Sequence, residues 1–96
     1  LATLASSTLK RTGAAQAAAL RDSTGRTYVA IAVTSPSLNL DAIQAVFTVA
    51  MASQISGIES VVITGVATGD ISVITTHSPA ATIFHFDESG VIAALR

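Results

Sequence analysis

The chain of 96 residues contains no cysteine, so it forms no disulfide bond and offers no thiolate as a nucleophile or as a zinc ligand. Charged residues are scarce at 11%, and aromatic residues are scarcer at 4%. Half of the residues are hydrophobic, mainly Ala, Val, Ile and Leu, which build tightly packed layers. Because so little charge is available to cover the surface, we expect exposed apolar patches and a homo-oligomer, either a dimer or a tetramer.

Positive charge is also too sparse for a nucleic-acid surface. The chain has five Lys and Arg residues against six Asp and Glu, and only Lys10 and Arg11 are adjacent. Phosphate-backbone binding depends on clustered basic side chains. We therefore expect no nucleic-acid partner.

No segment has the length and composition of a membrane span. The longest uncharged stretch, residues 42–58, is interrupted by Gln, Thr and Ser, and a span needs about 20 predominantly apolar residues. Nor does any stretch show the basic, apolar and small-residue order of a signal peptide. We expect no membrane association and a cytoplasmic location.

Local patterns predict one α/β domain over residues 1–96, in which helices cover a mixed sheet built from two pairs of strands. The Ala-rich residues 14–20 favour a helix on propensity alone, but Asp22–Gly25 is typical of a turn between two antiparallel strands. The expected elements are a helix over 1–12, strands over 14–21 and 26–33, a helix that ends at Gly57, strands over 59–66 and 82–86, and a final helical turn or two over 91–96.

The helix before Gly57 carries almost no chemistry. Ser37, Asn39 or Asp41 can cap its start, and apolar residues then occupy nearly every side of it. A helix that is apolar all round is buried on two sides. We expect one face to pack on the sheet and the other on a second subunit. The candidate interface residues are Val46, Phe47, Val49 and Met51.

The spacing of polar residues predicts no catalytic or metal site. His77, His85 and Asp87 are the nearest approach to a metal triad, but their spacing matches no common ligand pattern. Residues 64–70, TGVATGD, contain two glycines after a strand, yet lack the lysine of a phosphate-binding loop. We expect this segment to be a loop at the end of a strand.

The segment GRTYVAIAV followed by SPSLNLDAIQAVFTVAMASQISGIESVVIT resembles the cytidine deaminase superfamily, and most closely a short, cysteine-poor actinobacterial branch of it. The resemblance lies in the succession of hairpin, Ser-rich turn, buried helix, glycine and strand. It implies a three-layer α/β/α fold with a mixed sheet of about four strands.

The resemblance also implies where catalytic groups would stand. Active members carry Cys-Ala-Glu or His-Ala-Glu at the start of the buried helix, where the first residue binds zinc and the Glu moves protons. Counting back from Gly57 places Gln44-Ala45-Val46 there, and a shift of one residue places Ile43-Gln44-Ala45 there. Neither supplies a thiolate or imidazole ligand, or a carboxylate to move the proton.

Two further elements of the family are replaced in this chain. The second zinc motif, Pro-Cys-x-x-Cys at the start of another helix, corresponds to Ser78-Pro79-Ala80 without the cysteines or room for the helix. The ribose-binding Asn-x-Glu corresponds to Ala32-Val33-Thr34. Zinc supplies the nucleophile of such enzymes by lowering the pKa of a bound water to about 7. We therefore expect no cofactor, no metal and no catalytic residue.

The favoured interpretation is a catalytically inactive deaminase-fold protein that acts as an oligomeric scaffold or binds a protein partner. The first alternative is a binder of a small nucleoside-like ligand in the remnant of the family cleft, with Thr34, Gln44 and Ser78 as polar lining. An active cytidine or nucleoside deaminase is the least favoured reading. Residues assigned to the remnant pocket are Ala32, Thr34, Gln44, Ala45, Val46 and Ser78.

Overall fold

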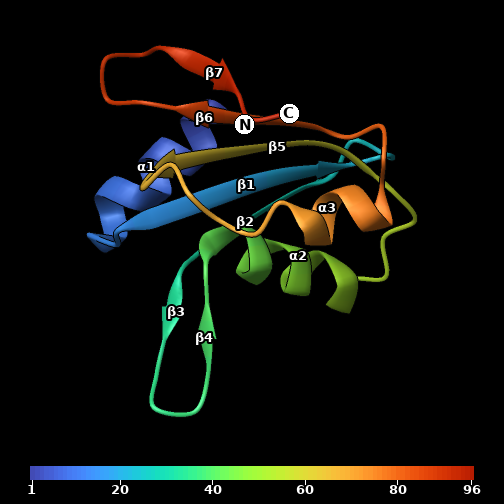
Figure 1. The fold of residues 1–96 in the computed structure, drawn as a ribbon, viewed down its shortest axis with the longest axis horizontal. Coiled ribbons are helices and arrows are strands. Elements are labelled where there is room, and N and C mark those ends of the chain that lie inside the picture. The colour runs from blue at the N-terminus through green and yellow to red at the C-terminus, as the bar shows by residue number, and fades with distance from the viewer.

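The computed structural model describes residues 1–96 and builds them around one mixed β-sheet (Figure 1). The elements are α1 (Ala2–Thr12), β1 (Gln16–Asp22), β2 (Thr27–Ile31), β3 (Val33–Thr34), β4 (Asn39–Leu40), α2 (Ala42–Ala52), β5 (Ile58–Gly65), α3 (Ser72–His77), β6 (Thr82–Phe86) and β7 (Ile92–Ala94). The main sheet has the order β2-β1-β5-β6-β7, and β3 and β4 form a separate hairpin. Only β5 and β6 are parallel neighbours; the other neighbouring pairs are antiparallel.

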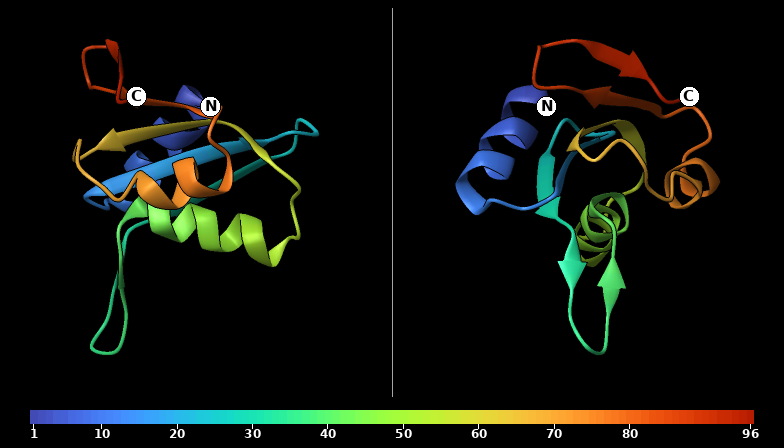
Figure 2. Two further views of the ribbon diagram at one scale, coloured as in Figure 1. Left: turned by 45° about the vertical axis from the view of Figure 1, so that its right-hand side comes forward. Right: turned by 60° about the vertical axis from the view of Figure 1, so that its left-hand side comes forward.

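Helices cover both faces of the sheet, so the predicted three-layer α/β/α architecture is confirmed. The right-hand view of Figure 2 shows α1 on one side of the strands and α2 with α3 on the other. This arrangement explains why Ala17, Ala18, Ala19 and Leu20 of β1 are all buried. Successive side chains of a strand point to opposite faces, and here each face is covered by a helix.

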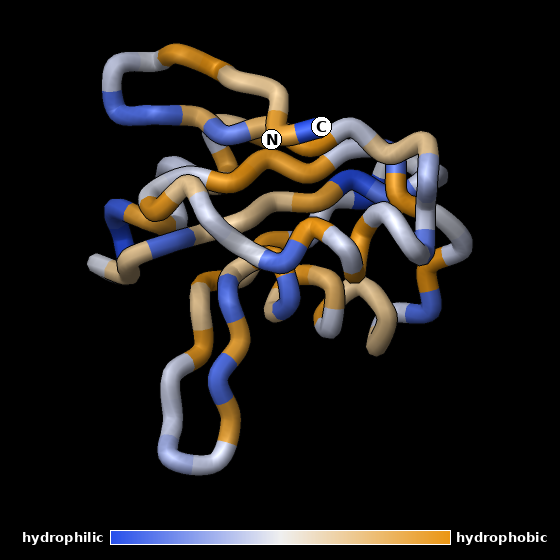
Figure 3. Tube along the Cα trace, viewed as in Figure 1, coloured by the Kyte–Doolittle hydropathy of each residue, from blue (hydrophilic) through white to orange (hydrophobic).

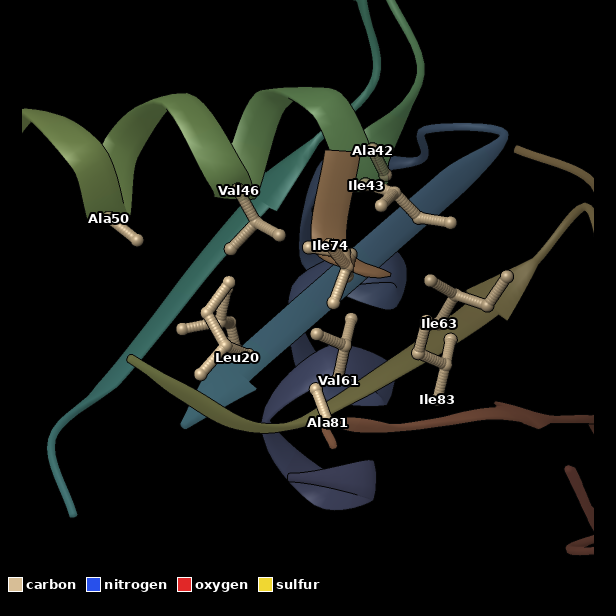
Figure 4. Close-up of a cluster of buried hydrophobic side chains, with 12 residues drawn as sticks. Leu20, Ala42, Ile43, Val46, Ala50, Val61, Ile63, Ile74, Ala81 and Ile83 are labelled. Carbon is tan, nitrogen blue, oxygen red and sulfur yellow. The ribbon is translucent and has the colours of Figure 1, made fainter. Parts of the chain in front are cut away.

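The main core lies between the sheet and the α2–α3 layer. Figure 4 shows Val46 of α2 and Ile74 of α3 pointing toward Leu20, Val61 and Ile63 of the strands. All five side chains are fully buried. Val61 and Ile63 belong to the β-branched run that the sequence predicted as a central strand, and β5 is indeed the middle strand of the sheet.

Four local predictions are corrected. Residues 91–96 were expected to be helical, but Ile92–Ala94 form β7, because the turn at Asp87–Gly90 brings the chain back against β6. The helix before Gly57 ends at Ala52. The short helix α3 was not among the predicted elements; it ends at His77, before Ser78-Pro79-Ala80, and no helix lies between it and β6.

The fourth correction concerns the segment between β2 and α2, which was expected to be a Ser-rich turn. It forms the β3–β4 hairpin, which projects away from the body of the protein (Figures 1 and 2). Both arms carry apolar residues along the projection (Figure 3). Leu38 and Val33 are its exposed large apolar side chains, with 51% and 37% of their surface accessible.

None of the three helices combines the length and hydropathy that a membrane-crossing helix requires.

Candidate functional site

The start of α2 is fixed by reciprocal hydrogen bonds. Asp41 caps the helix, and its Oδ1 accepts from the Gln44 main-chain N at 2.8 Å. The Gln44 Oε1 in turn accepts from the Asp41 main-chain N at 3.0 Å. This capping box satisfies main-chain donors that a helix start otherwise leaves unpaired. Of the three caps that the sequence suggested, Asp41 is the one used.

The same two side chains hold the loop that leads into α3. The second carboxylate oxygen of Asp41, Oδ2, accepts from the Asp70 main-chain N at 2.8 Å. The Gln44 Nε2 donates to the Asp70 Oδ2 at 3.4 Å. Hydrogen bonds from the hydroxyl and main-chain N of Ser72 lower the pKa of the Asp70 carboxyl. The segments that begin α2 and α3 are therefore tied directly together.

The side chain of Gln16, at the start of β1, also contacts the start of α2. Its side chain is buried, its Oε1 accepts from the Ala42 main-chain N at 2.9 Å, and its Nε2 donates to the carbonyl oxygens of Val66 and Thr68. One amide thus joins β1, α2 and the loop after β5. We call Gln16, Asp41, Gln44 and Asp70 the helix-start cluster.

Next to the helix-start cluster, Ile43 of α2 packs closely against Gly69 in the loop before α3. A Cβ atom added at Gly69 would lie only 2.8 Å from the Ile43 Cδ1, so the loop before α3 lies directly against the first turn of α2. Ile43 is fully buried. The two cavities of the protein lie elsewhere, and neither is lined by a member of the helix-start cluster.

Comparison with protein families now identifies the fold. Residues 1–90 match the family model described as "Cytidine deaminase-like", so this chain belongs to the cytidine deaminase-like family. A search of curated proteins found no match.

The predicted motif residues lie in the first turns of α2. In active members the zinc-binding and proton-transferring residues stand at the start of the buried helix, and here α2 is capped by Asp41 and begins with Ala42, Ile43 and Gln44. The count from Gly57 had placed Gln44-Ala45-Val46 there because it assumed that the helix continues to this glycine. Although α2 ends five residues before this glycine, these residues still lie near the helix start: Gln44 and Ala45 are in the first turn and Val46 begins the second.

The residues present do not fit a catalytic zinc ion. Such a site uses three protein ligands and keeps one position open for water. The helix-start cluster offers only the carboxylates of Asp41 and Asp70, and all four of their oxygens accept hydrogen bonds from neighbouring protein groups. No group of three or more His, Cys, Asp and Glu residues lies close enough together to hold a metal ion.

The two histidines serve other contacts. The His77 ring packs edge-on against Phe47, with ring centroids 5.9 Å apart, and its Nδ1 lies 2.8 Å from the Ser78 Oγ. The His85 Nε2 lies 2.8 Å from the Gly65 carbonyl oxygen. The two rings therefore do not form a shared site.

The residues assigned to a remnant pocket are not brought together. Ala45 and Val46 are buried in the core, and Thr34 is exposed on the projecting hairpin, two residues after half-buried Ala32. Gln44 lies at the start of α2, whereas the Ser78 Oγ accepts from the Ile58 main-chain N beyond the far end of α3. Neither cavity of the protein is lined by Thr34, Gln44 or Ser78, and their role as a polar lining stays a prediction.

The interface candidates are also divided by the structure. Val46 has no accessible surface within the single chain. Val49 is 42% exposed, while Phe47 and Met51 are half-buried. Side chains two positions apart on a helix point roughly 160° apart. Val49 therefore lies on one flank of α2, and Phe47 and Met51 lie on the other.

Sequence reasoning missed Gln16, Asp70 and their roles. The available signal was the single polar residue Gln16 within AAQAAAL, a strand that is otherwise apolar up to Arg21. A polar side chain in such a run is kept only if it finds hydrogen-bond partners. Its partners lie 26 or more positions away along the chain, so only the fold identifies them.

Proposed function

We propose that this protein is a catalytically inactive member of the cytidine deaminase-like family that acts as an oligomeric scaffold or protein-interaction domain. The main support is the closed helix-start cluster. Its carboxylates cap and join protein segments, and the fully buried Ile43 packs on the loop at Gly69. Neither the ligands for a metal ion nor an open coordination position is left.

The missing proton carrier supports the same proposal. Hydrolytic deamination needs a group that takes a proton from the attacking water and passes it to the departing ammonia. In active relatives that group is a Glu near the start of this helix, and here the first turn of α2, residues 42 to 45, holds three aliphatic residues and the amide Gln44 but no carboxylate. An aliphatic side chain cannot exchange a proton.

Metal content and deamination together test the loss of activity. Elemental analysis of the untagged protein should find no stoichiometric zinc, and cytidine incubated with protein and added zinc should release no ammonia. An active zinc-dependent cytidine deaminase run in parallel controls the assay. Zinc near one atom per chain together with ammonia release would contradict the proposal.

The oligomeric part of the proposal rests on the exposed apolar side chains. Large apolar side chains are exposed on the β3–β4 hairpin, on α2 and near β7. They include Val33, Leu38, Val49, Val91 and Ile92. Apolar surface of this kind marks contact sites in small proteins. Light scattering should give a mass two or four times the 9.7 kDa of one chain. A mass of one chain at all concentrations would contradict self-association. The cytoplasmic location stays a prediction.

A binder of a nucleoside-like ligand in the family cleft is less well supported. The residues expected to line that cleft do not share a cavity, and the space between the starts of α2 and α3 is filled by direct contacts. Thermal unfolding in the presence of cytidine should therefore give the same midpoint as in its absence.

A further inference from the structure

A small polar cavity lies at the opposite end of α2 from the helix-start cluster. It is bounded by the β1–β2 turn on one side and by the segment that follows α2 on the other, and its volume is about 280 Å³. The side chains that matter for its chemistry are Asp22, Arg26, Tyr28 and Gln54. Three Ser or Thr hydroxyls and one Ile make up the rest of the lining. None of its lining residues belongs to the helix-start cluster.

A buried carboxylate forms part of its wall. Asp22 has only 2% of its surface accessible. Its Oδ1 accepts from the Thr24 main-chain N, the Thr24 hydroxyl and the Arg26 main-chain N, all within 3.0 Å. Its Oδ2 has a single long partner, the Tyr28 hydroxyl at 3.4 Å. A carboxylate oxygen accepts two or more hydrogen bonds, so Oδ2 retains acceptor capacity.

The charge of Asp22 is not matched by a cation in the chain. Its hydrogen-bond partners are all neutral groups, and the Thr24 hydroxyl is the main cause that lowers the pKa of its carboxyl. The group is therefore ionised at neutral pH. A buried anion is favourable when a positive group reaches it.

Arg26 supplies the opposite charge at the same cavity. Its main-chain N donates to Asp22, the residue is exposed and lines the cavity, and its side chain makes no hydrogen bond within the chain. A guanidinium offers five donors in a planar fork that suits a carboxylate. The lining thus includes a carboxylate with spare acceptor capacity and an exposed arginine whose side chain has no partner in the chain.

Gln54 adds an independent observation. Its φ of +59° makes it the one residue other than glycine with a left-handed backbone, and its side chain lines the cavity. The position just past a helix end commonly takes this conformation, and glycine adopts it without strain. Glutamine there is less favourable for the backbone, and strained residues of this kind cluster at binding sites.

We propose that this cavity binds a free α-amino acid, whose ammonium group meets Asp22 and whose carboxylate meets Arg26. A zwitterion satisfies both charges at once, and the amide of Gln54 and the hydroxyls at the rim contact its polar atoms. The volume accommodates a small or medium amino acid. This site does not depend on the oligomeric or catalytic state of the protein.

Titration of ¹⁵N-labelled protein with each standard amino acid, in millimolar excess, tests the proposal. At least one should produce saturable shifts in the amide signals of Thr24, Arg26 and Gln54, and should raise the thermal midpoint as expected for a ligand of the folded state. Acetate and methylammonium carry one charge each and should bind at least about tenfold more weakly.

Two variants and a control locate the site. Arg26→Gln should weaken binding at least about tenfold, since it removes a charge-assisted contact. Gln54→Gly should raise the thermal midpoint of the free protein and still weaken binding. Arg11→Gln, on the exposed end of α1, should bind as the wild type does.

Three results would overturn the proposal. The first is the absence of saturable shifts with every amino acid, and the second is an Arg26→Gln variant that binds with unchanged affinity. The third is acetate or methylammonium binding as tightly as the amino acids, because the site would then recognise a single charge. A lowered midpoint with unchanged affinity in Gln54→Gly would show that Gln54 serves the fold alone.

Discussion

Gly65 ends β5 at a point where no other residue fits. Its φ is +89°, and a Cβ atom would collide with the carbonyl oxygen of Ala15 on the neighbouring segment. Gly90 has the same φ of +89° in the turn before β7, but no atom lies within 4 Å of the Cβ position there. The two glycines separate the cost of backbone strain from the cost of a steric clash.

Gly65→Ala should therefore lower the free energy of unfolding by at least about 2 kcal/mol, and Gly90→Ala by only about 1 kcal/mol. Urea unfolding followed by circular dichroism measures both values. Equal losses for the two variants would show that the close approach of Ala15 is relieved by movement of the chain.

The acidic residues should make stability depend on pH in the acid range. Hydroxyl and main-chain hydrogen bonds lower the pKa of Asp22, Asp70 and Asp87 in the folded state. An unfolded chain has an Asp pKa of about 3.9. Because the folded pKa values are lower, the stabilisation is complete at neutral pH and is lost as the pH falls below about 4.

Chemical unfolding between pH 2 and 7 should show this loss. The Asp22→Asn variant should be less stable than the wild type at pH 7 and should show a smaller decrease toward acid pH, since it removes one titrating group. A pH dependence identical to that of the wild type would contradict the role assigned to Asp22.

At the scale of the secondary structure elements, the start of α2 is stabilised by a hydrogen bond to Gln16 of β1 as well as by its own cap, Asp41. Gln16→Leu keeps the approximate side-chain size but leaves the Ala42 main-chain N and the carbonyls of Val66 and Thr68 without partners. We expect a loss of about 2–4 kcal/mol. Amide exchange at Ala42 should also become faster, because its hydrogen bond is removed.

Gln44→Leu is the matched control for that variant. It removes the Gln44 side-chain half of the capping box and the contact to Asp70, but Asp41 still accepts from the main-chain N of residue 44 and the buried hydrogen bonds of Gln16 stay intact. We expect a loss of about 1 kcal/mol or less, smaller than that of Gln16→Leu. A loss as large as that of Gln16→Leu would show that the capping box, and not the buried amide, fixes the start of α2.

The elements differ in how far local sequence specified them. The helix α1 ends at Gly13 as predicted, because a basic last turn and a glycine with φ +67° are local signals. The β7 strand has no such signal, since Val91–Arg96 suits a helical turn equally well. Its pairing with Phe84 and Phe86 of β6 decides the conformation, and that pairing follows from the turn geometry.

At the scale of the whole molecule, the exposed flank of α2 is the place to test self-association. Val49→Asp introduces a charge at a 42% exposed position on α2. If this flank packs against a second copy, burying an unpaired charge should dissociate the oligomer. Light scattering should then give the mass of one chain.

Ser7→Asp provides the control for that experiment. It places the same charge at an exposed position on α1, on the opposite face of the sheet. Its mass and its circular dichroism spectrum should match those of the wild type. An oligomer that survives Val49→Asp would exclude this flank as the interface.

The sequence by itself determined the class of fold, the positions of most strands and the absence of thiolate chemistry. These follow from hydrophobic periodicity, turn residues and composition, which act over a few neighbouring positions. Only the tertiary structure decided that Asp41 and Asp70 meet, that Gln16 joins three segments and that Val46 belongs to the core. It also separated Gln44 from Ser78 and brought Asp22, Arg26 and Gln54 to one cavity. Those relations join residues far apart along the chain, and local patterns carry no information about them.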